Sequence, residues 1–311
     1  MTGEISSAGK LAAFDLNAYV AERTALVLAG LDRFAPVADA PPATLHRAMR
    51  YSLFAGGKRI RPLLCMATAE AIGGSAESVL PTACALEMIH TFSLIHDDLP
   101  AIDDDDFRRG MPTAHREFGE AMAILAGDAL HTLAFSTVAL HQSGGTGSDA
   151  AARVVRVLGL IAESCGEAGM VGGQVDDILY EGQPVDGDIL RHIHARKTGA
   201  LLSASILAGA ILAGATAEQE RALEVYGEQI GLAFQIVDDI LDVTGDDAKI
   251  GKPTGSDLKN DKATYPKVYG LAESGELARK AADAAVAAVA GFDGRAEALR
   301  TFARFIVERD L

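Results

Sequence analysis

Residues 223–243 read LEVYGEQIGLAFQIVDDILDV and carry the pattern that decides the fold class. Apolar residues recur in this stretch at steps of three, four and seven, namely Leu223, Tyr226, Ile230, Val237 and Leu241. That spacing places them on one face of an α-helix. A similar stripe near the N-terminus comprises Leu16, Val20, Val27, Leu31 and Phe34. Only residues 151–162 form a β-like apolar run, so the sequence predicts an all-α protein.

The chain has 311 residues, enough for one large domain or two ordinary ones. No repeat and no low-complexity linker divides it, and its paired glycines are typical of turns between helices. Hydrophobic residues make up 49% of the chain, which is ample for a sizeable core. We therefore expect a single domain over residues 1–311, built from about ten or more helices, with residues 1–14 as a flexible N-terminal extension.

Acidic residues outnumber basic ones by 43 to 28, which gives a net charge of −15. Such a protein repels phosphate backbones and anionic lipid, which argues against a nucleic-acid or membrane-surface role. The three cysteines are odd in number and widely spaced, which favours buried thiols in a reducing compartment. Because the N-terminal residues lack a basic segment followed by a long apolar run, we expect a cytoplasmic protein.

One uncharged stretch, residues 198–217, is about as long as a bilayer span. It is rich in Ala, Gly, Ser and Leu, and small residues let helices approach closely, which also suits the middle of a soluble bundle. No second stretch of this kind exists, and charge resumes at Glu218. We therefore expect a buried core helix rather than membrane insertion.

A first acidic cluster places six aspartates within ten residues: Asp97, Asp98, Asp103, Asp104, Asp105 and Asp106. Such a run is commonly a solvated surface. Here an apolar helix over residues 80–99 leads into it, with Glu87, His90, Leu94 and Asp97 along one stripe. Pro100 favours a helix end, where the helix dipole is unfavourable for carboxylates. A bound cation would relieve that repulsion.

A second acidic cluster lies in the helix quoted above and comprises Asp238, Asp239 and Asp242. Gln235 shares a helix face with Asp238 and Asp242, about 100° from the apolar stripe. Carboxylates beside a core-facing stripe must be paired or metal-bound. Two acidic helices could therefore face each other across a cavity, and their oxygen ligands favour Mg²⁺, Mn²⁺ or Ca²⁺ over zinc.

Basic residues gather at a few places in this acidic chain. Lys58 and Arg61, in GGKRIRP (residues 56–62), stand at an expected helix start, where anions bind; a solvated loop is the alternative. The other bases are Arg108 and Arg109, Lys197 beside Thr198, and Lys252 and Lys262 in a loop after the second acidic helix. Together they indicate a site for two polyanions, one held through metals and one held directly by Lys and Arg.

Taken in order, these motifs resemble the short-chain trans-prenyl diphosphate synthases. DDLPAIDDDDFRRG (97–110) and DDILD (238–242) are similar to the two aspartate-rich motifs of that family. GGKRIRP, HTFSLIHDD (90–98), GMVGGQ (169–174), the Lys197-Thr198 pair and the GKP loop also match it. The resemblance spans roughly residues 45–275 and implies an all-α bundle around a central cavity, of the isoprenoid synthase type, and a homodimer.

The resemblance also implies a role for each matching residue. Two substrates, an allylic diphosphate and isopentenyl diphosphate, would be condensed with the help of about three Mg²⁺ ions, for which Mn²⁺ could substitute. The metal ligands would be Asp97, Asp98, Asp103, Asp238, Asp239 and Asp242. The allylic diphosphate would contact Arg108, Lys197, Thr198, Gln235, Lys252 and Lys262. The diphosphate of isopentenyl diphosphate would be bound by Lys58, Arg61, His90 and Arg109. Lys197, Thr198 and Gln235 would also stabilise a carbocation.

Product length depends in that family on residues about one turn before the first motif. The fifth residue upstream of Asp97 is Phe92 and the fourth is Ser93. A bulky ring at that position should stop chain growth early. The first motif is also the longer form, with four residues between Asp98 and Asp103, and an aromatic residue with that longer motif resembles the bacterial farnesyl diphosphate synthases. We therefore expect farnesyl diphosphate (C15), made from dimethylallyl and then geranyl diphosphate. Geranylgeranyl diphosphate (C20) is the alternative, and Phe92 could also be an ordinary core aromatic.

Three other classes of protein share part of the pattern. A di-iron bundle requires two ExxH motifs, and only Glu87 with His90 supplies one. A terpene cyclase would use an aspartate-rich helix with Mg²⁺ but would leave Lys58 and Arg61 without a purpose, and the chain has no Trp to line its pocket. A calcium-binding module would not explain the bases, and EF-hand spacing is absent.

Overall fold

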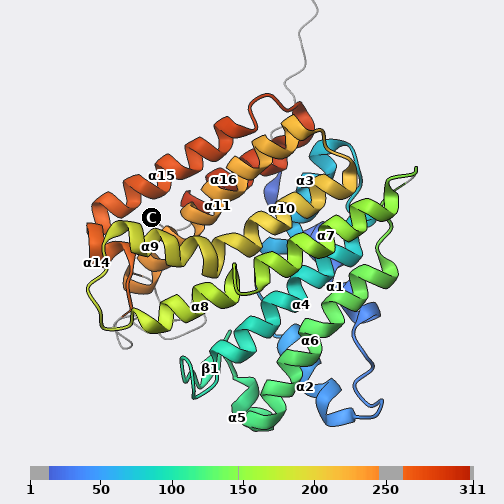
Figure 1. The fold of residues 1–311 in the computed structure, drawn as a ribbon, viewed down its shortest axis with the longest axis vertical. Coiled ribbons are helices and arrows are strands. Elements are labelled where there is room, and N and C mark those ends of the chain that lie inside the picture. Colours follow the sequence, from blue (N-terminus) through green and yellow to red (C-terminus); the bar gives the residue numbers. More distant parts are fainter. Residues whose placement is uncertain (1–13, 146, 245–261, 309–311) are drawn as a thin grey trace, which may run out of the picture.

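The computed structural model describes residues 14–145, 147–244 and 262–308, and these are almost wholly helical (Figure 1). The first part comprises α1 (Leu16–Phe34), α2 (Ala43–Leu53), α3 (Ile60–Ile72), a 3₁₀ turn η1 (Glu77–Val79), α4 (Leu80–Asp97), the hairpin strands β1 (Phe107–Arg108) and β2 (Met111–Pro112), α5 (Ala114–Phe118) and α6 (Glu120–His141). The second part comprises α7 (Ala150–Cys165), α8 (Met170–Leu179), α9 (Gly187–His194), a π-helical turn η2 (Ala195–Gly199), α10 (Ala200–Ala213), α11 (Ala217–Thr244), α14 (Tyr265–Tyr269), α15 (Leu271–Ala288), a 3₁₀ turn η3 (Gly294–Ala296) and α16 (Glu297–Glu308). The all-α prediction is confirmed.

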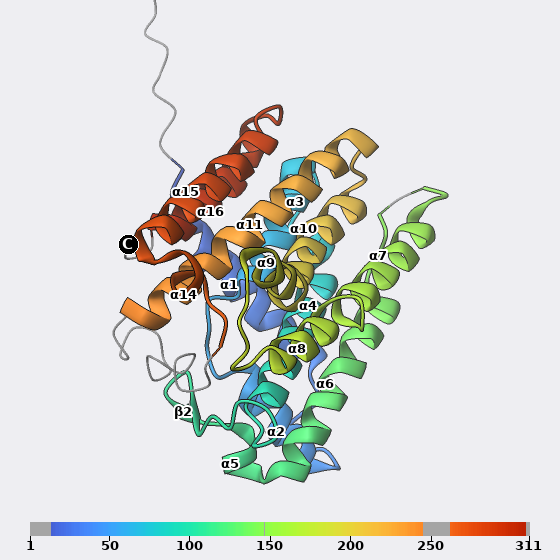
Figure 2. The ribbon, with the colours of Figure 1, turned by 60° about the vertical axis from the view of Figure 1, so that its left-hand side comes forward.

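The helices pack in two groups that share α3 and α10. In one group, α4 packs against α3 and α6, and its apolar side chains join those of α1, α2 and α6. In the other, α11 packs against α10 and α15, and α15 lies beside it in both views (Figures 1 and 2). The two apolar stripes read from the sequence, in residues 16–34 and 223–241, belong to α1 and α11.

The uncharged stretch forms the end of η2, all of α10 and the turn that leads into α11, and most of α10 is buried. Gly209 shows why small residues are needed, because a Cβ there would lie 2.2 Å from the carbonyl oxygen of Cys65 on α3. By length and composition alone, three helical stretches of the described chain could cross a membrane: Glu77–Asp97, Glu120–His141 and Gly187–Ala213. Their most apolar windows are 67%, 39% and 61% buried inside the protein, so the first and third mainly serve the core.

The β-like reading of residues 151–162 is wrong, because this segment forms helix α7. The buried side chains of α7 are Val157, Ile161 and Cys165, which recur at steps of four as on one helix face. Its β-branched residues gave a local strand signal, which packing of that face against α10 and α6 overrides.

Candidate active site

A cavity of about 550 Å³ opens between α3, α4, α8, η2 and α11. Eleven of the residues selected from the sequence line it: Arg61, His90, Phe92, Ser93, Asp97, Arg108, Arg109, Lys197, Thr198, Gln235 and Asp238. They come from segments far apart in the chain, and the fold brings their side chains together in one cavity. A volume of this size suits a small organic substrate.

The two acidic helices meet at this cavity, as expected. Asp97 is the last residue of α4, and Asp238 lies on α11 one turn after Gln235. Burial raises the pKa of Asp97, and the neighbouring Asp103 adds to the effect, although Lys197 opposes it. Carboxylate oxygens on both walls of one cavity are the donor set that Mg²⁺ prefers. The residues present therefore fit a divalent cation bound between the walls.

Asp98 lies on another side of α4 from Asp97. It caps the helix, is 3% exposed and borders a separate, smaller cavity. Its Oδ1 accepts a hydrogen bond of 2.5 Å from Nε of Arg108, and burial raises the pKa of Asp98 to about 7. The geometry therefore makes Asp98 the residue that holds Arg108 toward the main cavity.

The second motif is organised by hydrogen bonds that run across α11. The Thr198 hydroxyl donates to Oε1 of Gln235 at 2.7 Å, and Nε2 of Gln235 donates to Oδ1 of Asp239 at 2.8 Å. Oδ2 of Asp239 accepts from the backbone N–H of Tyr265 at 2.8 Å. Asp239 and Asp242 are both buried and neither lines the cavity, in contrast to Asp238. The chain of bonds fixes which way the Gln235 amide faces.

Asp177 on α8 is a member of the site that the motifs did not reveal. Its Oδ2 lies 2.5 Å from Nζ of Lys197 and 3.3 Å from Nζ of Lys262, and Lys262 also contacts Oδ1 of Asp103 at 2.7 Å. Burial alone would raise the pKa of Asp177, but the two lysines outweigh it and hold that pKa below its ordinary value. Asp177 thus positions two of the predicted diphosphate-binding lysines.

The GMVGGQ motif explains how α8 comes so close to Lys197. A Cβ on Gly173 would lie 2.2 Å from the backbone nitrogen of Lys197, so only glycine permits this contact. Gln174, the next residue, lines the cavity, and its Nε2 is buried without a hydrogen-bond partner. Gln174 is therefore a further candidate donor to a bound substrate. It is the last residue of the GMVGGQ motif, which the sequence offered only as a family resemblance.

A cationic corner occupies the α3 side of the cavity. Arg61 is buried, its Nε has no hydrogen-bond partner, and burial lowers its pKa to about 10, so it stays protonated at neutral pH. Burial and the nearby arginines hold the pKa of His90 well below its ordinary value, which leaves the imidazole neutral. A buried cation with an unpaired donor calls for an anion.

Two further features shape this corner. The buried Arg59 pairs with Glu87 at 2.5 Å, which places the carboxylate of Glu87 in an ion pair and argues against its use as an iron ligand. The guanidinium of Arg109 lies over Gly57, where a Cβ would come within 2.5 Å of its Cζ, and Gly57 has a φ of 112°. Lys58 is exposed and does not line the cavity. Lys252 lies outside the described residues.

The remaining wall is apolar and comes largely from α8 and α11. It comprises Met170, Val171, Val175, Ile178 and Phe234, together with Leu94, Ile102 and Phe92. The ring of Phe92 packs against His131 at 4.7 Å and His96 at 5.1 Å between ring centroids. The hydroxyl of Ser93 donates to the carbonyl of His90 at 2.9 Å. Polar groups thus cluster at one side of an otherwise apolar chamber.

Comparison with known proteins agrees with this geometry. A family described as polyprenyl synthetase matches residues 42–296. A geranylgeranyl diphosphate synthase of Cyanophora paradoxa is 47% identical over 96% of this chain and 97% of its own length. The heterodimeric geranylgeranyl pyrophosphate synthase large subunit 1 of Arabidopsis thaliana is 46% identical over 95% of this chain and 80% of its own.

Solved structures show the same fold. The geranylgeranyl pyrophosphate synthetase of Pyrococcus horikoshii superimposes with a TM-score of 0.85 at 32% identity, covering 95% of this chain and 98% of its own. An FPP/GFPP synthase of Zymomonas mobilis gives a TM-score of 0.81 at 34% identity, covering 94% and 100%.

The expectation of a C15 product is wrong in the light of the relatives from Cyanophora, Arabidopsis and Pyrococcus, which are named for the C20 product. The argument took the size of Phe92 as sufficient to close the chamber. In the structure, two histidine rings hold the Phe92 ring on one wall, while the chamber also extends along the apolar face of α8. Side-chain size alone therefore did not fix the length of the chamber.

Proposed function

Because the chain belongs to the polyprenyl synthetase family, we propose that this prenyltransferase makes geranylgeranyl diphosphate (C20) by successive head-to-tail condensations of isopentenyl diphosphate with an allylic diphosphate. The observation that carries the proposal is that two acidic helices and a cationic corner open into one apolar chamber. A diphosphate fits each polar part, and the growing hydrocarbon fits the apolar wall.

Mg²⁺ is the cofactor that suits the acidic walls. Asp97 and Asp238 would hold it, with Asp103 close by. The buried Asp239 and Asp242 do not line the cavity and would have a supporting role within α11. When bound, such ions neutralise a diphosphate and favour its departure. Mn²⁺ offers the same preference for oxygen ligands and could substitute.

The chain's own residues would orient the two substrates. Arg108, held by Asp98, and Lys197, held by Asp177, face the allylic diphosphate and stabilise the charge that grows on it as the C1–O bond breaks. Arg61 and Arg109, with neutral His90 as a hydrogen-bond donor, bind the diphosphate of isopentenyl diphosphate. The double bond of that substrate then supplies the electron pair for the new C–C bond.

The site must also protect a cationic carbon and accept a proton. The oxygen of Gln235 is turned toward Thr198 and its amide is fixed by Asp239, so the Gln235 dipole can stabilise positive charge without reorienting. The apolar wall excludes water that would otherwise quench the cation. Loss of a proton from the adduct restores an alkene, and the released pyrophosphate would accept that proton.

A direct test of the proposal uses the purified full chain with Mg²⁺, isopentenyl diphosphate and dimethylallyl, geranyl or farnesyl diphosphate. We expect pyrophosphate release only when both substrates are present, and chromatography should show C20 as the main product from each starter. Asp238→Asn should lower the rate at least about 100-fold, whereas the matched Asp188→Asn, on an exposed aspartate of α9, should not.

Other outcomes of this assay have clear meanings. Consumption of an allylic diphosphate without isopentenyl diphosphate would indicate a cyclase and would contradict the proposal. A C15 product that persists at excess isopentenyl diphosphate would leave the family assignment intact but overturn the C20 product.

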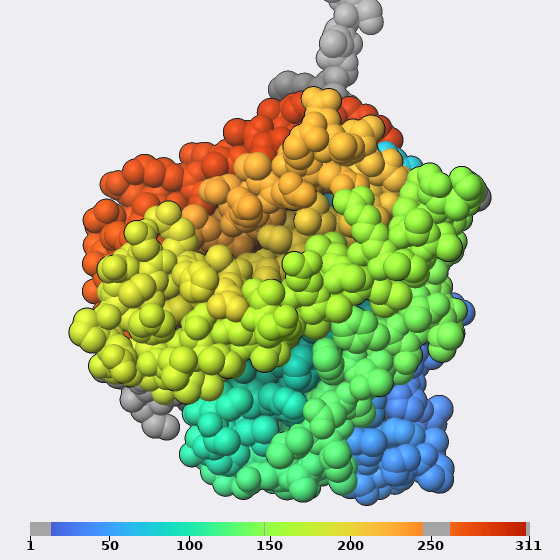
Figure 3. Space-filling model, in the orientation of Figure 1, coloured from blue at the N-terminus to red at the C-terminus, as the bar shows by residue number. Residues whose placement is uncertain are grey.

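We also propose that the protein acts as a homodimer through the exposed face of α6. Ile124 is 43% exposed, Leu125 51% and Leu140 77%, and this green helix lies on the surface seen in Figure 3. Large exposed apolar side chains on one helix favour a protein–protein contact. Sedimentation equilibrium should give twice the chain mass of 32.4 kDa, and Leu125→Glu should shift it toward the monomer. A monomeric wild-type protein would contradict this.

A single folding unit and a cytoplasmic location complete the proposal. The three cysteines are free and buried, as a reducing compartment allows. One cooperative unfolding transition and recovery in the soluble fraction of fractionated cells are the measurements that test these two points.

A further inference from the structure

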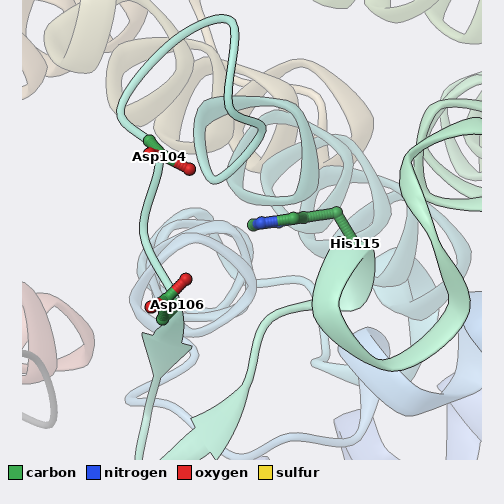
Figure 4. A group of neighbouring side chains, drawn as sticks. All are labelled: Asp104, Asp106 and His115. Carbon is green, nitrogen blue, oxygen red and sulfur yellow. The ribbon is translucent and has the colours of Figure 1, made fainter.

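A group of three side chains lies outside the main cavity, on the loop that follows α4 and on α5. Asp104 and Asp106 come from the loop and His115 from the first turn of α5, and one ligand atom of each lies within 4.8 Å of the others. Figure 4 shows the imidazole of His115 directed into the space between the two carboxylates. None of the three lines the main cavity.

The buried nitrogen of His115 is the observation that points to a ligand. His115 is 6% exposed, and its Nε2 has no hydrogen-bond partner. Unpaired buried polar atoms are rare in folded proteins and call for an explanation, such as an ion. A carboxylate cluster alone would be unremarkable on an acidic surface, so it is this nitrogen that makes the group specific.

The protonation of His115 follows from its other contact. Nδ1 lies 3.1 Å from the hydroxyl oxygen of Thr113, and that hydroxyl donates its one proton to the carbonyl of Asp105 at 2.8 Å. Because the hydroxyl contact to the Asp105 carbonyl is the shorter one, we assign the hydroxyl proton to it and the ring hydrogen of His115 to Nδ1, which leaves a lone pair on Nε2. Histidines that bind metals typically donate their second ring N–H in this manner.

The charges around that lone pair are unbalanced. The described residues place no cation within ion-pair distance of the exposed Asp104, while Asp106 pairs with the exposed Arg116. A lone pair facing two carboxylates is repulsive, and a metal ion bound between the three groups would relieve that repulsion. Separations up to 4.8 Å leave room for one ion, since metal–ligand bonds to His and carboxylate are about 2.0–2.2 Å long.

We propose that Asp104, Asp106 and His115 form a second metal site, for a divalent transition ion of the Zn²⁺ type. One imidazole nitrogen with two carboxylates favours Zn²⁺ or Mn²⁺ over Mg²⁺, which prefers oxygen ligands. The exposure of both aspartates leaves positions for water. The ion ties the loop beside Asp103 to α5 and thereby steadies the hairpin that carries Arg108. The site is independent of the proposed function.

The test is equilibrium binding of Zn²⁺ to the full chain in millimolar Mg²⁺, which fills the all-oxygen walls of the cavity. We expect one Zn²⁺ per chain, weakened at least about 10-fold by Asp104→Asn and by His115→Asn. Asn keeps a donor at the position of Nδ1 for Thr113 while it removes Nε2. Glu117→Gln, on an exposed acid two residues away, is the matched control and should bind as the wild type does.

Two further points make the test decisive. Asp104 is exposed, so its variant folds even if replacement of the buried His115 does not. Co²⁺ in place of Zn²⁺ should give a visible spectrum that both variants alter, because Asp104 and His115 belong to the proposed site and not to the main cavity. Zn²⁺ binding that is unchanged in Asp104→Asn, or equally weakened in Glu117→Gln, overturns the proposal.

Discussion

Replacement of Asp177 by Asn tests the cluster that holds Lys197 and Lys262. The variant keeps the shape of the side chain but removes the charge that lies 2.5 Å from one lysine and 3.3 Å from the other. Lys262 retains Asp103 at 2.7 Å, whereas the described residues offer Lys197 no second acid at ion-pair distance. Loss of a buried pair costs about 3–5 kcal/mol, and the 22% exposure of the Lys197 side chain reduces this to about 2–3 kcal/mol.

That free energy translates into a measurable shift in Tm. The entropy of unfolding is about 2.1 cal/mol/K per residue, or about 0.65 kcal/mol/K for 311 residues. Asp177→Asn should therefore lower Tm by about 3–5 °C at pH 7, followed by circular dichroism. The adjacent Asp176→Asn is the control, because Asp176 pairs with Arg196 in a more exposed position and should cost less than about 1 kcal/mol.

The pH dependence supplies the sign of the effect. The pKa of Asp177 is depressed in the folded protein, so its contribution is fully present above the ordinary carboxyl range and is lost as pH falls through the folded value. The difference in Tm between wild type and variant should shrink in acid. A difference that is constant with pH, or an equal loss in Asp176→Asn, would refute the reasoning.

Three other variants probe the remaining parts of the site. Glu87→Gln strands the buried Arg59 and should cost about 3–5 kcal/mol in urea unfolding; a loss below about 1 kcal/mol contradicts the ion pair. Arg61→Gln should raise KM for isopentenyl diphosphate about 10–100-fold and leave KM for the allylic substrate nearly unchanged. An equal rise in both KM values, measured by steady-state kinetics, would contradict the assignment of Arg61 to one substrate. Gln235→Leu breaks the hydrogen bond from Thr198 and should lower kcat about 10–100-fold with little change in KM. An unaltered kcat would show that the Gln235 amide does not stabilise the cation.

Much of the fold and of the site follows from local chemistry in the sequence. The stripes in α1 and α11 are helical by spacing, and the aspartates of α4 and α11 stand at helix positions where unpaired carboxylates are costly. The sequence alone therefore predicts that Asp97 and Asp238 lie on facing walls of one cavity. The hydrogen-bond chain through Gln235 was only partly visible, because the position of Tyr265 depends on tertiary packing.

Other features were hidden for physical reasons. Asp177 on α8 is separated from Lys197 on η2 by a loop and by helix α9, so no short-range spacing joins them. Asp98 and Asp97 look equivalent in sequence, yet a turn of about 100° sends one to the cavity and the other to Arg108. The prediction of product length failed because that length depends on the shape of a chamber lined by several helices rather than on Phe92 alone.

The π-helical turn η2 has a consequence for how this protein can change. A π-helical turn holds one residue more than an α-helical turn does. The side chains of α9 are therefore rotated about the helix axis relative to those of α10, although α9, η2 and α10 follow one another without a break. Deleting a single residue from 195–199 would restore regular winding and swing α9 by about 100° about the rod. The packing of α10 would keep its register, but Lys197 and Thr198 would face elsewhere and the buried Leu190 and Ile193 of α9 would turn out of the core, so the site and the packing of α9 depend on the same extra residue.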